Sequence, residues 1–266
     1  MLCLFAYCND ANSSLNVGYL TCGDFKMSYI LSMETLEILT KKHENILLVD
    51  KPKGITSYDV IRKLKKKYGK LKLGHAQKLK LGHAGTLDPL ATGLLIVGVG
   101  KGTKRMAEFL KLPKTYEVEI LLGVRTDTGD LEGKCLQVES VNIDDVDGER
   151  VRKVLEEMVG KIELSVPVYS AIKQKGVPLY KRARRGEHVM PPKKKMEIRR
   201  ILLREIRREE DKTILDVVMD VGSGTYVRSI AEEVGKCLGV PATVKELRRT
   251  KVGDFDVKGA KRLTNI

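Results

Sequence analysis

The stretch GHAGTLDPLATGLLIVGVGKGTK (82–104) joins a turn-rich segment to a short apolar run. Its Gly, Pro and Asp content predicts a loop over 85–93, and LLIVGV (94–99) is typical of a buried strand. The glycines do not form a nucleotide-binding loop. Gly102 stands where a phosphate loop needs Ser or Thr, and Thr103 stands where the dinucleotide fingerprint needs Gly. We therefore expect neither a nucleoside triphosphate nor NAD at this stretch.

The neighbouring segments supply strands and helices. ILLVD (46–50) reads as a strand, and Ser57 is expected to cap a basic helix that runs to Tyr68. TYEVEILL (115–122) alternates apolar and polar residues, as a half-buried strand does. Further strands are expected at 197–210 and 213–221, and further helices near 104–110, 151–159 and 227–234. Because no regular βαβ rhythm appears, we expect an α+β fold with a largely antiparallel, mixed central sheet flanked by helices and loops.

The composition favours a polyanionic partner. The chain of 266 residues carries 49 Lys and Arg against 35 Asp and Glu, a formal net charge of +14. Cations that neutralise phosphates release counterions, so nucleic acid is the favoured partner. Acidic protein faces, membrane surfaces, or a basic protein without such a partner remain alternatives.

Several classes of protein are disfavoured. Five cysteines without a C-x-x-C pair indicate reduced thiols in a cytoplasmic protein. The histidines share no i, i+4 pair and no carboxylate cluster, so no metal is expected. No apolar run approaches the ~20 residues of a membrane span. The first 26 residues fit no targeting pattern, and we expect residues 1–44 to be a disordered extension or the result of a mis-assigned start.

A tandem duplication precedes the opening stretch. KLKLGHA occurs at 70–76 and again at 78–84, so one copy is expected to be an insertion. Only His83, in the second copy, is followed by the G-T-L-D-P sequence. His75 therefore does not fit any role that depends on the loop after the histidine.

The loop around Asp88 resembles the G-H-x-G-[TA]-L-D-P-x-A-x-G motif of the tRNA pseudouridine synthase B (TruB-type) family, whose catalytic aspartate lies in L-D-P. Ala84 departs from the Thr that is common in this motif. Further similar motifs follow in the family's order: LLVDKPKGITSYDV (47–60), KTYEVEILLGVRTDTGDLEG (114–133), VPVYSAIKQKGVPLYKRARRGE (166–187), GSGTYVRSIAEEVGKCLG (222–239) and VKELRRTKVGDF (244–255). The resemblance covers about 45–256 and implies a pseudouridine synthase fold that uses no cofactor and no metal.

The resemblance implies three catalytic residues. Asp88 matches the nucleophile, which attacks C1′ or C6 or assists proton removal at C2′; these alternatives stay open. Arg228 matches the arginine that pairs with this carboxylate and opposes its protonation on burial. Tyr116 matches the tyrosine that stacks on the target base and assists proton transfer at C5. On local pattern alone, Asp88 could cap a turn, Arg228 could lie at a helix start and Tyr116 could be an ordinary core residue.

Four further residues match substrate-binding positions of the family. Tyr226 lies two residues before Arg228, so both can face one pocket if the backbone is extended there. Leu247 matches an apolar wall of the uracil pocket. His83 matches a wedge beside the flipped-out nucleotide, and Lys51 matches a residue near the floor of the site.

The implied substrate is a uridine in the T-arm of tRNA, usually numbered 55. We expect a catalytic domain over 45–266 with an RNA-binding insertion at about 165–195, rich in Lys and Arg. A C-terminal PUA-type module, frequent in relatives, is expected to be lacking. We expect a cytoplasmic monomer with no obligatory protein partner and no membrane association.

Two other functions remain open from sequence. The chain could modify another RNA, as the guide-RNA-dependent branch of the family does. It could also be a non-catalytic RNA-binding protein or tRNA-folding chaperone that keeps the fold. Product formation on a tRNA transcript separates these alternatives from the first.

Overall fold

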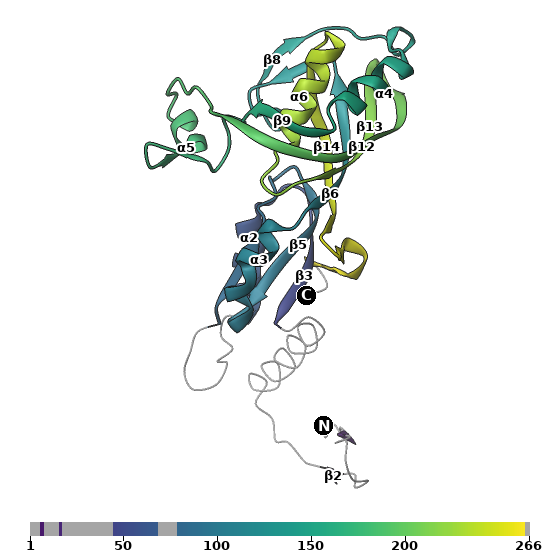
Figure 1. Ribbon diagram of the computed structural model, residues 1–266. Helices are drawn as coiled ribbons and strands as arrows, with labels where there is room; N and C mark the ends of the chain where they lie inside the picture. Colours follow the sequence, from purple (N-terminus) through teal and green to yellow (C-terminus); the bar gives the residue numbers. More distant parts are fainter. Residues whose placement is uncertain (1–5, 8–15, 18–44, 69–78, 264–266) are drawn as a thin grey trace.

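One ten-stranded sheet runs through the computed structural model, which describes residues 6–7, 16–17, 45–68 and 79–263 (Figure 1). Eight strands follow the order β16-β3-β5-β14-β6-β13-β12-β9, while β4 pairs with β5 and β15 pairs with β14. Only the β5–β14 and β3–β16 pairings within this sheet are parallel. The strands are β3 (Ile46–Lys51), β4 (Leu81–Ala84), β5 (Thr92–Val99), β6 (Lys114–Leu122), β9 (Gly160–Ser165), β12 (Lys193–Glu209), β13 (Lys212–Val221), β14 (Ala242–Val252), β15 (Phe255–Asp256) and β16 (Lys261–Arg262).

Helices cover the two halves of the sheet differently. In the half formed by β6, β13, β12 and β9, α4 (Gly148–Glu157) and α6 (Val227–Leu238) pack on one face, where the largest core cluster forms. In the half formed by β3, β4 and β5, α2 (Ser57–Tyr68) and α3 (Met106–Lys111) cover opposite faces. The expected α+β class with a largely antiparallel, mixed sheet is confirmed.

The start of α2 differs from the expected one. Thr56, not Ser57, caps the helix: its hydroxyl accepts from the Asp59 amide at 3.0 Å, and the Asp59 carboxylate accepts from the Thr56 amide at 2.8 Å. This reciprocal pair is a capping box. The expected cap at Ser57 is therefore wrong, and the buried Ser57 hydroxyl is free for a tertiary contact.

A short parallel seam joins the two halves of the sheet. Strand β14 lies between β5 and β6 and pairs with β5 through Arg248↔Thr92 and Arg249↔Gly93. Gly93 has φ +100°, and a Cβ there would lie 2.2 Å from the Arg249 carbonyl oxygen. Only glycine fits this backbone approach. The buried Arg249 guanidinium then donates to the carbonyls of Leu94 and Gly85, on either side of the loop that contains Asp88.

The basic excursion is partly regular. Between β9 and β12 it contains the strand pair β10 (Lys173–Gln174) and β11 (Val177–Pro178), followed by α5 (Leu179–Arg184). In Figure 1 this segment projects from the left of the upper half. The three lysines at 193–195, expected within the excursion, belong to β12.

Other elements lie close to their expected positions. The helix expected near 104–110 is a 3-10 turn, η1 (Gly100–Arg105), followed by α3. Residues 123–147 form β7 (Val124–Thr126), β8 (Cys135–Val138), η2 (Ile143–Asp145) and connecting loops, and η3 (Val257–Gly259) follows β15. The expected 1–44 extension lies outside the described residues except for β1 (Ala6–Tyr7) and β2 (Asn16–Val17), as does the first copy of the duplication. In the described part of the chain, no helix is long and apolar enough to cross a membrane.

Candidate active site

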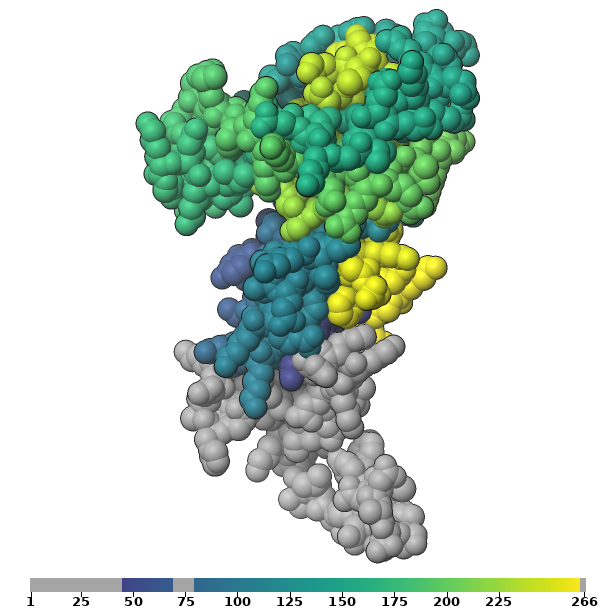
Figure 2. All heavy atoms as spheres, viewed as in Figure 1, coloured from purple at the N-terminus to yellow at the C-terminus, as the bar shows by residue number. Residues whose placement is uncertain are grey.

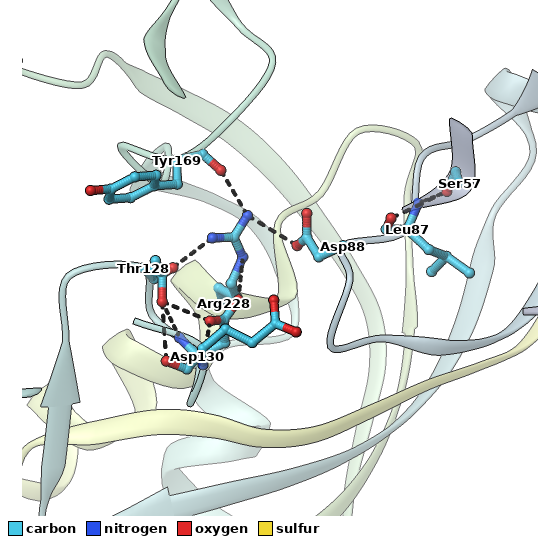
Figure 3. Close-up of polar contacts among 8 residues, drawn as sticks. Ser57, Leu87, Asp88, Thr128, Asp130, Tyr169 and Arg228 are labelled. Atoms are coloured by element: carbon cyan, nitrogen blue, oxygen red, sulfur yellow. Dashed lines mark hydrogen bonds and ion pairs between the residues drawn. The ribbon is translucent and has the colours of Figure 1, made fainter. Parts of the chain in front are cut away.

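Asp88 lies in a turn that is held on both sides of the carboxylate (Figure 3). The Leu87 amide donates to the Ser57 hydroxyl at 2.8 Å, and this hydroxyl lies 3.2 Å from the Leu87 carbonyl. After Asp88, the Pro89 carbonyl accepts from the Gly54 amide at 2.9 Å and from the Lys51 ammonium at 3.3 Å. The segment 51–57 therefore fixes the backbone on each side of Asp88.

Arg228 pairs with Asp88 across the two halves of the sheet. Its Nη2 lies 3.0 Å from Asp88 Oδ2 and donates to the Tyr169 carbonyl at 3.1 Å. Its Nη1 donates to the Thr128 carbonyl at 2.6 Å, and its Nε lies 3.8 Å from Asp130 Oδ2. With a side chain only 6% exposed, this guanidinium is held in one orientation by four partners (Figure 3).

Opposing influences act on the Asp88 carboxylate. Burial raises the pKa of Asp88 above its ordinary value, while the Arg228 guanidinium lowers it. The negative charge of Asp130 raises the pKa again, and Lys51 lowers it. Because burial disfavours the charged form, the two cations are what favour an ionised carboxylate here.

Lys51 is a buried cation beneath the turn. Its ammonium donates to the carbonyls of Ile55 at 2.7 Å and Pro52 at 2.9 Å, besides its contact with Pro89. Burial lowers the pKa of Lys51 to about 8, although the charges of Glu132 and Asp88 oppose this shift. The expected place of Lys51 near the floor of the site agrees with this geometry.

Tyr116 and Leu247 lie in the core cluster that also contains Leu87 and Leu90, on either side of Asp88. Tyr116 is on β6, and Leu247 is on the adjacent β14, where it pairs with Val118. The Leu247 carbonyl accepts from the Thr92 hydroxyl at 3.4 Å, close to the end of the Asp88 loop. Leu247 therefore lies close to the loop, whereas no hydrogen bond or ion pair among the described residues links Tyr116 to Asp88. The roles of both side chains toward a substrate stay predictions.

Tyr226 precedes α6 and lies near the same charges. Burial raises the pKa of Tyr226; the Ser170 side chain and Arg228 lower it, and Asp88 raises it. The condition of an extended backbone from Tyr226 to Arg228 is not met, because α6 starts at Val227. Tyr226 is the last extended residue, and Arg228 is in the first helical turn.

His83 is the expected site residue that is least connected to the others. It lies on β4 opposite Val97, and burial followed by the charge of Arg249 lowers its pKa. Its buried Nδ1 has no hydrogen-bond partner among the described residues. No hydrogen bond or ion pair in the described part of the chain links it to Asp88 or Arg228.

Several residues of the site were not singled out from sequence. Asp130 lies in the R-T-D-T-G-D run, where its carboxylate accepts from the Thr128 hydroxyl at 2.6 Å and from the Glu132 amide at 3.1 Å. Two carboxylates in a six-residue turn were the available signal. No sequence signal indicated the carbonyls of Tyr169 and Thr128, because a backbone carbonyl is present in every residue and does not depend on residue type.

The site offers one nucleophilic carboxylate and no gathered metal ligands. Among the described residues, no three His, Cys, Asp or Glu side chains form a group that could hold a metal ion. A carboxylate with a fixed guanidinium beside apolar walls suits covalent or proton-transfer chemistry at a carbon centre.

Family models match almost the whole described chain. The model "TruB family pseudouridylate synthase (N terminal domain)" matches residues 65–227, and "tRNA pseudouridylate synthase B C-terminal domain" matches 228–266. The chain therefore belongs to the TruB family of pseudouridylate synthases. The stretch matched by the second model contributes α6 and β14 to β16, which complete the same sheet rather than a separate one.

Curated relatives agree with this family. The tRNA pseudouridine synthase B of Endomicrobium trichonymphae is 41% identical over 219 residues, which cover 82% of this chain and 89% of the relative. That of Staphylococcus saprophyticus is 36% identical, with coverage of 84% and 71%. A chain in a crystal structure of a Cbf5-Nop10-Gar1 complex superposes with a TM-score of 0.60 at 27% identity, over 84% of this chain and 54% of that one. This chain spans about half the length of that solved chain.

Proposed function

We propose that this protein converts uridine to pseudouridine at the T-loop position of tRNA usually numbered 55, with Asp88 as nucleophile. The observation that carries the proposal is the 3.0 Å pair between Arg228 on α6 and Asp88, which lies in the loop that matches the family motif. The names of the relatives support tRNA as the substrate.

The reaction needs little beyond one positioned carboxylate. The bond between uracil N1 and ribose C1′ breaks, the base turns within the pocket, and C5 bonds to C1′. N1 gains a proton and C5 loses one, so the product is an isomer and no electrons are exchanged with a cofactor. A closed site that retains the free base is therefore the main further requirement.

Each expected residue has a part in this proposal. Arg228 keeps Asp88 ionised and oriented toward the sugar. Tyr116 stacks on uracil and assists loss of the C5 proton, while Tyr226 and Leu247 wall the pocket. Aromatic and aliphatic walls retain a neutral base through stacking and apolar contact, so they need no charge.

The target base must leave its stack in the T-loop. Flipping costs a few kcal/mol, which stacking and phosphate contacts offset. Within the proposed catalytic domain over 45–266, the basic excursion between β9 and β12 supplies such phosphate contacts, and His83 fills the space that the base leaves. We infer a cytoplasmic monomer that needs no obligatory protein partner and uses no metal.

The likeness to a chain of a Cbf5-Nop10-Gar1 complex favours one second candidate. In this alternative, the same isomerisation occurs on another RNA with the help of partner proteins. The smaller coverage of that chain, 54% against 89% of the first relative, makes the tRNA reaction the better supported function.

One assay tests both candidates. Purified protein is incubated with an unmodified tRNA transcript and with a transcript that lacks the T-loop uridine, and pseudouridine is mapped by carbodiimide-stop sequencing. Product at the T-loop of the first transcript alone supports the proposal. Product elsewhere supports the second candidate. Binding without any product contradicts the proposal but not the second candidate, because its RNA and partner proteins are absent from this assay.

A further inference from the structure

Helix α2 presents a cationic face to solvent. Its buried side consists of Ser57, Val60, Ile61, Leu64 and Tyr68. The other side is exposed and carries Tyr58, Arg62, Lys63, Lys65 and Lys66. Tyr58, Arg62 and Lys65 or Lys66 follow the i, i+4, i+7/8 spacing of a single helical stripe, so one aromatic ring and several cations line the same surface.

Most of this charge is not neutralised within the protein. Arg62 pairs with Asp59, but no carboxylate of the described residues pairs with Lys63, Lys65 or Lys66. Like charges on one helix face repel each other modestly, and a bound polyanion would relieve this repulsion.

The outer face of the central sheet is different. There three arginines of β12 pair with acids on β13 and on β6, the strand beyond it: Arg200 with Asp220, Arg204 with Glu117 and Arg207 with Glu119. The positive charges on that face form ion pairs with carboxylates of the same protein. The charge on α2 therefore differs from that on β12, because three exposed lysines without a carboxylate partner among the described residues lie on one short helix.

The stripe on α2 starts at the active-site loop. Ser57, the first residue of the helix, bonds to Leu87, which is adjacent to Asp88. Tyr58 follows with 60% of its surface exposed, and the helix then extends for roughly 18 Å at 1.5 Å per residue. In Figure 1, α2 lies on the left side of the lower half, and the excursion around α5 projects to the left from the upper half, as it also does in Figure 2.

We propose that this stripe binds the RNA strand next to the nucleotide held at Asp88. Lys65 and Lys66 contact backbone phosphates, and the Tyr58 ring stacks on an exposed base close to the loop. Aromatic stacking combined with a basic track is how proteins hold unpaired nucleotides. This inference rests on the proposed function, since it places the target nucleotide at Asp88.

Charge reversal with a matched control tests the phosphate contacts. Affinity for an unmodified tRNA transcript is measured for the full chain at several salt concentrations, with Asp88→Asn in every arm so that no turnover occurs. We expect Lys65→Glu/Lys66→Glu to weaken binding on the order of tenfold. The slope of log affinity against log salt should fall by about 2, one unit per lost contact.

The control reverses two lysines elsewhere. Lys153 on α4 and Lys212 at the start of β13 are exposed and have no carboxylate partner among the described residues. Lys153→Glu/Lys212→Glu changes the net charge equally and should change affinity less than twofold. If both double variants lost the same amount of tRNA affinity, the loss would be due to net charge alone, and the proposal would be overturned.

The ring of Tyr58 has its own test. Tyr58→Ala should weaken binding about fivefold or more, and Tyr58→Phe should bind like the unsubstituted chain, because stacking needs only the ring. Unchanged affinity in Tyr58→Ala would overturn the stacking contact. Circular dichroism melting of all variants shows whether exposed substitutions have left the fold intact.

Two outcomes separate this inference from competing explanations. If the α2 lysine variant binds tRNA normally but loses binding to phosphatidylserine vesicles, the stripe is a membrane surface and the proposal is overturned. If the unsubstituted chain makes no pseudouridine while the α2 variant still binds tRNA weakly, the proposed function fails and the RNA-binding stripe remains supported.

Discussion

Asp88 illustrates how a single side chain depends on its neighbours. Burial raises its pKa, and Arg228 acts in the opposite direction. An ionised carboxylate is required, so kcat/KM should fall as the pH drops through this raised value, at a higher pH than for an ordinary aspartate. In Arg228→Gln, the acid limb of the residual activity should move further upward. A profile from about pH 4 to pH 8 checks this; an acid limb in the variant that does not move would contradict the role of Arg228.

Asp88 itself is tested by an isosteric change. Asp88→Asn keeps the shape of the turn and removes the nucleophile, so product should disappear while tRNA affinity stays within about twofold. Product is measured by sequencing after carbodiimide treatment, and affinity by filter binding. Surviving turnover would show that another group attacks the substrate.

Ser57 is expected to act through backbone position. Ser57→Ala removes both contacts with Leu87, and a displacement of Asp88 by a fraction of an ångström should lower kcat on the order of tenfold to a hundredfold with KM nearly unchanged. Thr213→Ala is the matched control, because its buried hydroxyl also bonds a carbonyl, that of Val141. Both changes should cost about 1–2 kcal/mol of stability, but only the first should slow turnover.

The sequence predicted which residues form the main part of the site better than it predicted the groups to which they hydrogen-bond. Asp88 and Arg228 come from distant motifs, and the structure brings them together as expected. The loop that contains Asp88 was predicted, but the contact of Ser57 with Leu87 that holds it was not, because Ser57 reads equally well as a helix cap. Local pattern shows that a hydroxyl lies at a helix start, but it does not show which distant backbone group it contacts.

At the scale of elements, Gly93 controls the β5–β14 seam. Gly93→Ala should lower the free energy of unfolding by at least about 3 kcal/mol, since the new Cβ meets the Arg249 carbonyl and the backbone conformation is also disfavoured. Gly160→Ala is the control, with φ +117° and no atom within 4 Å. Denaturant unfolding should show a clearly larger loss for the first variant; equal losses would mean that the seam adapts.

Alternation predicted the strands, but it did not predict their neighbours. The face of β6 formed by Tyr116, Val118, Ile120 and Leu122 is buried as expected. The place of β14 between β5 and β6 depends on contacts between segments far apart in the chain, which periodicity does not encode. The long β12 also starts at Lys193, in a run of lysines with weak strand propensity, where pairing with β9 outweighs local preference.

At the scale of the whole molecule, buried lysines make stability depend on pH. Lys114 donates to the carbonyls of Leu110 and Leu112, and burial lowers its pKa to about 8. The unfolded chain keeps the ordinary value of 10.5, so between these pH values only the unfolded state still holds the proton. The free energy of unfolding should therefore rise with pH across this window.

The size of this effect follows from a comparison of two proteins. Relative to Lys114→Met, the unsubstituted chain should gain on the order of 1–3 kcal/mol between about pH 8 and pH 10. Urea unfolding of both proteins at each pH measures the difference between their free energies of unfolding. The contributions of other titrating groups are common to both proteins and cancel in this difference. A difference that is constant with pH would show that Lys114 keeps its ordinary pKa in the folded protein.

The net charge of the sequence indicated a polyanionic partner, but not where it binds. The structure distinguishes arginines on the sheet that have acidic partners from lysines on α2 that do not. Such a distinction needs tertiary neighbours, because the acids that pair with β12 come from other strands. Composition alone treats all these cations alike.

The central position of β14 has a consequence for synthesis on the ribosome. The strands on both of its sides, β5 and β6, emerge long before it. Strand β6 keeps one edge unpaired until residues 242–252 are translated, whereas β5 waits for β14 only at Thr92 and Gly93, because β4 pairs with the end of that edge. Nascent chains then expose hydrophobic edges that invite misassembly, as slowly completed sheets do. Stalled ribosomes that carry residues 1–241 should therefore hold a protease-sensitive chain, and release of the last strands should convert it to the resistant fold in one cooperative step.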